Sequence, residues 1–232
     1  MKTAAIARPY LTLLGIFGLC LAFSQVTNAQ TYDRRIVGDA RIAHDASIAY
    51  DVSLSYTIDS NSVINIKGTS PLHDWWMTAH AFTGNAKFSF AENKDDGSSE
   101  LSAVTEFSLK LPVHNLKSES NGMEKNACKA LKADQYKDIV FELTSARFKA
   151  SGSRYYLILL HGNLTMAGVT QPTTLKTSAR INEDGTIFCT GSLPIYLSDY
   201  NIERPSYLLG TMKVGDVLTL NYNLLLVKTH SF

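Results

Sequence analysis

The sequence has few cysteines and lacks the short motifs of several enzyme and metal-binding classes. Its three cysteines, Cys20, Cys128 and Cys189, form no Cys-x-x-Cys pair, so a local redox or zinc motif built on cysteine is missing. It also lacks the Gly-x-Ser-x-Gly stretch that places a nucleophilic serine in many hydrolases. The six histidines form neither His-x-x-x-His nor His-Glu-x-x-His, and we therefore expect no metal site and no cofactor.

A sustained apolar run occurs at the N-terminus. Lys2 and Arg8 precede a nearly continuous apolar segment at residues 11–23, and the small residues 27–29 follow before Gln30. A positive start, an apolar middle and a small-residue end are typical of a cleaved secretory signal peptide. The run is shorter than the about 20 residues that a membrane-spanning helix needs. The pattern predicts a signal peptide at residues 1–29.

We therefore expect an exported protein, periplasmic or secreted. Leu19 precedes Cys20 where a lipoprotein signal has a small residue, so no lipid anchor is expected. The whole chain has 22 basic and 21 acidic residues, and removal of Lys2 and Arg8 leaves 20 against 21, a net charge of −1 with neutral histidines. No basic block remains, which makes nucleic acid a poor candidate partner.

Two cysteines, Cys128 and Cys189, remain after cleavage. An oxidising compartment permits a disulfide between them, but a bridge requires Cα atoms within about 7 Å, and the sequence does not fix that distance. The sequence is therefore compatible with a disulfide between the two cysteines and with two free thiols.

Apolar and polar residues alternate through most of the remaining chain, which indicates half-buried antiparallel strands. On one expected strand, Leu101, Ala103 and Phe107 share the inner face. Asp184-Gly185 marks a hairpin turn. We expect strands near residues 50–58, 64–66, 82–90, 101–113, 139–143, 156–166, 175–181, 187–197 and 217–227.

One segment, residues 121–133, has helical spacing instead. Asn121 and Glu124 resemble a capping box, and apolar residues recur every three or four positions after them. The helix also carries Lys125, Lys129 and Lys132. These lysines indicate either a solvated face or a cationic spot that attracts an acidic head group beside an opening.

The number of strands predicts an all-β protein with eight or nine antiparallel strands and one inserted α-helix. Such a chain closes into a barrel or stacks into a sandwich, because either solution buries the apolar faces and protects the strand edges. We find no internal repeat and no linker, so residues 47–232 are expected to form one domain. Residues 30–46 lack sustained periodicity and are expected to form a loose arm.

The stretch GTSPLHDWWM at residues 68–77 brings together polar and aromatic residues of the kinds that form catalytic and binding sites. His73 and Asp74 are adjacent, and neighbours on an extended chain point to opposite faces, so a catalytic pair is disfavoured. We expect one of them to stabilise the turn before the next strand. Trp75 and Trp76 should likewise point to opposite faces, one inward and one outward.

Several phenylalanines are expected on the inner face of the strands. They are either plain core or the lining of a cavity, since alternation does not separate the two. These residues are Phe82, Phe88, Phe90, Phe107 and Phe141.

Four stretches in order resemble the YceI-like family of exported lipid-binding proteins. They are GTSPLHDWWM (68–77), SESNGMEKNACKALKADQYKDIVFEL (118–143), GNLTMAGVTQPTTL (162–175) and LSDYNIERPSYLLGTMKVGDVLTL (197–220). The resemblance implies a lipocalin-like barrel with a long apolar tunnel for an amphiphile such as a polyprenyl or quinone-like molecule.

The resemblance favours a non-enzymatic carrier of an isoprenoid-type lipid without stable membrane insertion. We expect His73, Trp75, Phe82, Phe88, Phe107 and Phe141 to contact the ligand. Two alternatives remain: an outer-membrane β-barrel, and an enzyme that acts on a bound lipid with His73 or His161 as base. The sequence leaves open whether two barrels form a homodimer.

Overall fold

The computed structural model describes residues 50–92, 97–207 and 212–229, which belong to the unit Asp45–Phe232. The expected signal peptide (1–29) and arm (30–46) lie outside the described residues. Among the described residues, no helix is both long enough and apolar enough to cross a bilayer.

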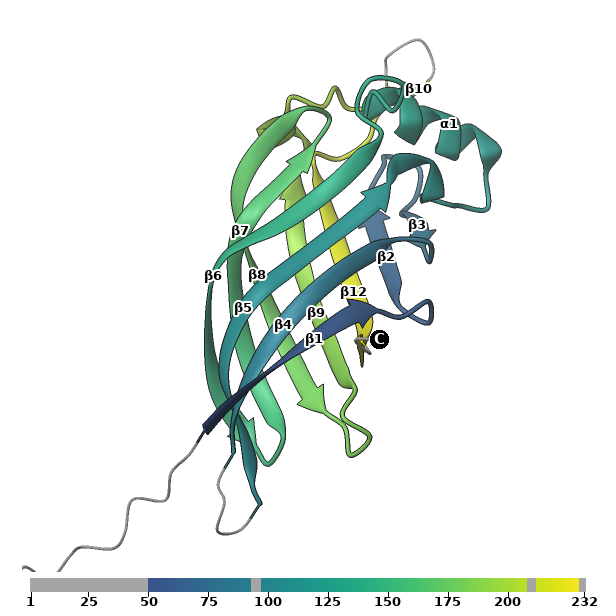
Figure 1. The fold of residues 1–232 in the computed structure, drawn as a ribbon. Helices are drawn as coiled ribbons and strands as arrows, with labels where there is room; N and C mark the ends of the chain where they lie inside the picture. The colour runs from purple at the N-terminus through teal and green to yellow at the C-terminus, as the bar shows by residue number, and fades with distance from the viewer. Residues whose placement is uncertain (1–49, 93–96, 208–211, 230–232) are drawn as a thin grey trace, which may run out of the picture. The chain divides into compact units, whose positions relative to one another are not determined.

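Eight antiparallel strands form a closed ring (Figure 1). The strands of the ring, in spatial order, are β1 (Tyr50–Ile58), β4 (Thr83–Glu92), β5 (Ser99–Pro112), β6 (Asp138–Gly152), β7 (Tyr155–Met166), β8 (Val169–Ile181), β9 (Ile187–Tyr196) and β12 (Val217–Lys228). β12 pairs with β1 and closes the ring, for example through Thr57 opposite Val227. The expected all-β barrel is thus confirmed.

Two short strands extend the barrel at one end. β2 (Val63–Gly68) pairs with the first half of β12, and β3 (Trp75–Ala79) pairs with β2. A single bridge between Thr78 and Lys117 ties β3 to the segment after β5. A two-stranded ribbon of β10 (Ser206–Tyr207) and β11 (Met212–Lys213) lies apart from the ring in the hydrogen-bond pattern.

The helical segments follow the strands at the same end of the barrel as β3 (Figure 1). They are η1 (Val113–Asn115), α1 (Asn121–Ala130) and η2 (Leu197–Tyr200). α1 is the single α-helix of the described residues, and the sequence predicts one helix here. The residue that caps its start is not the predicted one. Ser120, not Asn121, is the N-cap, because its hydroxyl accepts the Met123 N–H at 3.4 Å.

Alternation assigns most strand faces correctly, with one exception on β5. The register between β4 and β5 shifts twice, so that Phe88 faces Val104 and Phe90 faces Leu101. Leu101, Val104 and Phe107 are all buried. Ala103 pairs with Ser89 on the other face, and the expectation that it points inward is wrong because β-bulges interrupt the alternation.

A polar pair, Tyr222 and Thr177, is buried in the core. The Tyr222 hydroxyl lies 2.7 Å from the Thr177 hydroxyl and donates to the Lys176 carbonyl at 3.3 Å. Gly191 makes room for this ring, since a Cβ there would overlap the Tyr222 hydroxyl and lie 2.6 Å from the Lys176 carbonyl. Burial raises the pKa of Tyr222 to about 12, against a smaller opposing effect of the Thr177 hydrogen bond.

We predict that Gly191→Ala destabilises the barrel by about 2–4 kcal/mol, because Tyr222 must move and give up its hydroxyl partners. The matched control is Gly122→Ala in the first turn of α1, where the nearest atom to an added Cβ is the Ser120 Oγ at 3.6 Å. The control should be neutral or stabilising by up to about 1 kcal/mol. Urea unfolding of both variants provides the comparison, and equal midpoints would contradict the account.

We also predict a loss of stability in alkaline solution. Burial raises the pKa of Tyr222 from 10.0 and that of Cys189 from 9.0, each to about 12. The folded state holds the protons on these groups more tightly than the unfolded state. Their contribution to the free energy of unfolding is therefore complete below pH 9 and falls as the pH rises to about 12.

Each group adds a slope of at most about 1.4 kcal/mol per pH unit. Urea midpoints measured along this pH range should therefore fall less steeply in Tyr222→Phe than in the natural chain. Identical slopes would show that the pKa of Tyr222 is the same in the folded and unfolded states and would contradict the prediction.

Candidate functional site

An apolar cavity lies inside the barrel, at the end covered by α1. It has about 140 Å³ of space that the centre of a water molecule can reach. We call it the tunnel pocket. Its lining from the strands consists of Ile64, Ile66, Trp75, Met77, Phe107, Leu109, Leu111, Ile139, Phe141, Leu164, Met166, Leu175, Leu193, Ile195, Leu218, Leu220, Tyr222 and Leu224. Leu116, Leu197, Ile202, Pro205 and Val214 join them from the connecting segments.

Several inward-pointing residues of this lining keep accessible surface. Leu175, Leu193, Leu218 and Leu220 are only half-buried, although they belong to the apolar core cluster. Side chains in a close-packed interior lose almost all of their surface to their neighbours. These leucines therefore face a space that the protein's own side chains leave unfilled.

The other end of the barrel holds deeply buried aromatic and aliphatic side chains. Tyr56 and Phe88 meet edge-to-face with their ring centroids 5.5 Å apart, and both are less than 5% exposed. Ile158, Ile187 and Leu226 are buried to the same degree, and none of these five residues lines the tunnel pocket. The cavity is therefore confined to the part of the barrel near α1.

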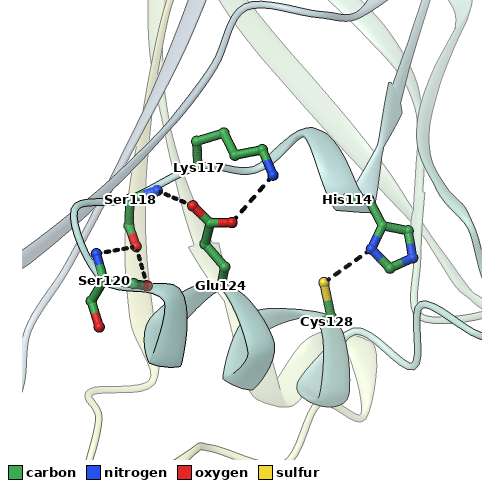
Figure 2. A network of polar contacts seen from close by, with 6 residues as sticks. All are labelled: His114, Lys117, Ser118, Ser120, Glu124 and Cys128. Atoms are coloured by element: carbon green, nitrogen blue, oxygen red, sulfur yellow. Dashed lines mark hydrogen bonds and ion pairs between the residues drawn. The ribbon is translucent and has the colours of Figure 1, made fainter.

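The helix α1 forms one wall of the tunnel pocket. Ala127, Ala130 and Leu131 line the cavity from this helix and its C-terminal end. The start of the helix is fixed by polar contacts (Figure 2). The Glu124 carboxylate accepts the Ser118 N–H at 3.1 Å and pairs with Lys117 at 3.2 Å, and the Ser118 hydrogen bond is the main cause of a lowered Glu124 pKa.

The stretch at residues 68–77 places one tryptophan in the site. The Trp75 indole packs against Gly68, where any Cβ would overlap the ring, and its Nε1 donates to the Thr69 carbonyl at 3.3 Å. Trp75 lines the tunnel pocket, whereas Trp76 is 57% exposed beneath the Lys67 ammonium. The prediction that the two indoles face opposite sides is confirmed.

The adjacent His73 and Asp74 do not form a catalytic pair with each other. Asp74 pairs with Lys67 at 2.7 Å. The turn is held by Ser70, whose hydroxyl donates to the His73 carbonyl at 2.8 Å and accepts the His73 N–H at 3.3 Å. His73 is exposed and lies outside the lining of the tunnel pocket.

The expected phenylalanines divide into two groups. Phe107 and Phe141 line the tunnel pocket, with ring centroids 6.0 Å apart in an edge-to-face arrangement. Phe82 and Phe88 are buried but lie outside the lining. Contact with a ligand stays a prediction for all of them, and the geometry favours Trp75, Phe107 and Phe141.

The sequence reasoning missed the aliphatic part of the lining. Leucines of β8, β9 and β12, such as Leu175, Leu193 and Leu220, line the cavity and are only partly buried. A signal was present, because these residues alternate with polar ones on expected strands. Alternation identifies their face but gives no information on what lies opposite.

A second, polar cavity of about 550 Å³ lies against α1. We call it the lysine groove, after Lys117, Lys125, Lys129 and Lys132, which line it. The remaining lining residues are His114, Leu116, Asn121, Glu124, Cys128, Ala133 and Asp134.

The two remaining cysteines lie in different environments. The Cys128 thiol faces the lysine groove, with its Sγ 3.5 Å from His114 Nδ1 (Figure 2). Cys189 is buried inside the barrel. Both are free thiols in the structure.

Candidate catalytic and metal groups lie away from the tunnel pocket. His161 is half-buried on β7, and its Nδ1 lies 2.8 Å from the Thr174 hydroxyl, outside the lining. In the part of the chain that the structure describes, no three His, Cys, Asp or Glu side chains are grouped closely enough to hold a metal ion.

Comparison with solved structures places this fold among known barrels. BcnA from Burkholderia cenocepacia matches with a TM-score of 0.54 and 15% identity, over 72% of this chain and 98% of that one. A polyisoprenoid binding domain from Saccharophagus degradans matches with a TM-score of 0.55 and 10% identity, over 76% and 99%. At these identities the likeness shows the fold alone. No curated protein matches the chain.

The model of one protein family matches residues 56–226, which include α1, six strands of the ring in full and parts of β1 and β12. The matched family is described as the YceI-like domain. This chain belongs to the YceI-like family.

Proposed function

We propose that this protein binds an isoprenoid-type lipid, polyprenyl or quinone-like, in the tunnel pocket without chemical conversion. The observation that carries the proposal is the apolar lining, in which half-buried leucines face open space. A prenyl chain has no hydrogen-bonding groups, so its affinity comes from burial of apolar area at about 25 cal/mol per Å² before the costs of ordering.

Two further facts support this proposal. The Tyr222 hydroxyl in the lining is engaged with Thr177 and the Lys176 carbonyl, so an apolar chain leaves no polar group newly unpaired. The domain of Saccharophagus degradans with the same fold is described as polyisoprenoid binding.

The outer face of the barrel argues against the membrane-barrel alternative. Exposed charged residues such as Glu142, Arg147, Lys149, Lys176 and Arg180 alternate with the inward apolar ones. A barrel that spans a membrane has the reverse arrangement, with an apolar outside and a polar inside.

The enzyme alternative has less support from the geometry. Its two candidate bases, His73 and His161, lie outside the lining of the tunnel pocket. A general base must come within hydrogen-bonding distance of the proton that it removes. We therefore propose a carrier and not a catalyst.

We also propose that the protein is exported and acts in the periplasm or outside the cell, on the basis of residues 1–29. The N-terminal sequence of protein recovered from the native host should begin at Gln30. Protein that retains residues 1–29 and is found in the cytosol would contradict export.

The chain offers a built-in test of lipid binding, because it has only two tryptophans. In Trp76→Phe, Trp75 is the only indole and reports from the tunnel pocket. We predict that farnesol changes the Trp75 emission in a saturable manner. In Trp75→Phe, the exposed Trp76 should not respond.

Larger side chains that fill the cavity should weaken the binding of farnesol. We predict that the double variant Leu175→Phe/Leu193→Phe, made in the Trp76→Phe background, weakens farnesol binding at least about tenfold by occupying the space. Leu157→Phe on the exposed outer face of β7 is the matched control and should bind normally. Equal binding by all three proteins would place the lipid elsewhere and refute the tunnel assignment.

A further inference from the structure

Large apolar side chains are exposed on the outside of the barrel at the end where α1 lies (Figure 1). Among the described residues, Leu72, Trp76, Tyr196 and Val217 are between 42% and 69% exposed. We call these four residues the rim patch. Exposed apolar surface that is continuous often marks an interaction site, whereas scattered apolar residues do not.

The strand register shows that three members of the rim patch share one continuous surface. Val217 lies directly opposite Tyr196, and two residues further along β12 Thr219 lies opposite Lys67. Lys67 in turn lies opposite Trp76. Residues that pair across strands, or that are two apart on one strand, point to the same face. Four strands about 4.8 Å apart give this surface a width of about 15 Å.

The same strands face the tunnel pocket with their other side. Trp75 and Leu218, the neighbours of Trp76 and Val217, line the cavity. The loop that carries Leu72 is tied to the segment before β12, since the Gly215 N–H donates to the Thr69 carbonyl at 2.8 Å. A single layer of sheet therefore separates the rim patch from the tunnel pocket.

The side chains of the rim patch have the chemistry of residues at a membrane surface. Trp and Tyr combine an apolar ring with a polar atom and are enriched where a bilayer meets water. The Lys67 ammonium lies 5.5 Å from the centroid of the Trp76 ring and pairs with Asp74 at 2.7 Å. Polar partners thus flank the indole and leave more than half of it exposed.

The surface continues from the rim patch to the lysine groove. Lys117 bridges to Thr78, which is two residues from Trp76 and shares its face. The groove lining holds four lysines against Glu124 and Asp134. Of these lysines, only Lys117 forms an ion pair within the part of the chain that the structure describes. The flank of the rim patch therefore carries a surplus of positive charge, which attracts an anionic surface.

We propose that the rim patch, with the adjoining lysines, docks the protein on the surface of an anionic phospholipid bilayer. No strand crosses the bilayer, because only exposed side chains at one end enter it. The inference rests on the proposed function: a prenyl chain partitions from water into a bilayer, so its carrier must meet that surface to load or release it. Apolar burial and electrostatic attraction act together in such surface binding.

Trp76 can report the contact directly. In Trp75→Phe it is the single indole of the chain. Vesicles of equal parts phosphatidylglycerol and phosphatidylcholine should shift its emission to shorter wavelength, and lipids brominated on the acyl chain should quench it. Vesicles of phosphatidylcholine alone should bind at least about tenfold more weakly, and added salt should narrow this difference.

Paired variants locate the docking surface. Trp76→Ser/Tyr196→Ser should weaken co-sedimentation with the anionic vesicles at least about tenfold, because it removes two aromatic side chains from the contact. Tyr155→Ser/Leu157→Ser is the matched control, since it removes side chains of similar exposure from β7, and it should bind as the natural chain does. The first variant retains Trp75, so its response to farnesol shows that the tunnel pocket is intact.

The lysines are tested in the same assay. Lys125→Gln/Lys129→Gln should weaken binding to the anionic vesicles at least about fivefold. Lys149→Gln/Lys176→Gln removes the same charge from exposed positions on β6 and β8 and should leave binding unchanged.

The outcomes separate docking from ligand binding, because the vesicles contain no prenyl lipid. Equal binding by the two serine variants, or equal binding to anionic and neutral vesicles, would overturn the docking proposal and leave the carrier proposal standing. A Trp76 emission that shifts with protein concentration without vesicles, together with a dimer in sedimentation velocity, would assign the rim patch to a second copy and also overturn docking. Failure of the Trp76→Phe protein to bind farnesol would overturn the carrier proposal itself.

Discussion

The architecture depends on the pairing of β12, because one of its two edges has two partner strands. One edge pairs with β9 along ten residues, whereas the other pairs with β2 at Thr219–Asn223 and with β1 at Leu226–Lys228. Closure of the ring by β1 eliminates the free edges that would otherwise invite association. The strand β2 does not close the ring, because it continues into β3 at the end where α1 lies.

This division separates two ends of the barrel that differ in burial. At the end closed by β1, Tyr56 and Phe88 of the neighbouring strands β1 and β4 pack edge-to-face and are both buried. At the end flanked by β2 and β3, leucines of several strands line the tunnel pocket, and the helix α1 forms one of its walls. An apolar space of this kind forgoes dispersion contacts along its lining, which an apolar chain can restore.

The sequence predicts the fold well and the cavity poorly, for a physical reason. Alternation reports which face of a strand is apolar, and this predicted the strands and the opposite orientation of Trp75 and Trp76. It does not report the distance to the opposite wall. Phe88 and Phe107 are the same residue type on the same inner face, yet Phe88 packs against Tyr56 and Phe107 lines the cavity.

The details that alternation missed arise from local hydrogen bonding. The register shifts on β5 turn Ala103 outward, and Ser120 is the N-cap of α1 because its hydroxyl accepts the Met123 N–H. Likewise, Asp74 serves Lys67 and not its neighbour His73, a pairing across strands that spacing along the chain does not reveal. The resemblance of four stretches to one family supplied what periodicity could not, since it implied a lipocalin-like barrel where alternation left a barrel and a sandwich both open.

The chemistry of the lining determines how such a barrel can select its ligand. An apolar wall distinguishes ligands by length and width, and one methylene more or less changes affinity by only about 1–3 kcal/mol. The Tyr222 hydroxyl in the lining already has Thr177 and the Lys176 carbonyl as hydrogen-bond partners and adds little recognition. Sharper discrimination therefore requires polar groups beyond the tunnel pocket. The lysine groove lies next to the tunnel pocket, since Leu116 lines both, and its lining carries four lysines where that of the tunnel pocket is apolar.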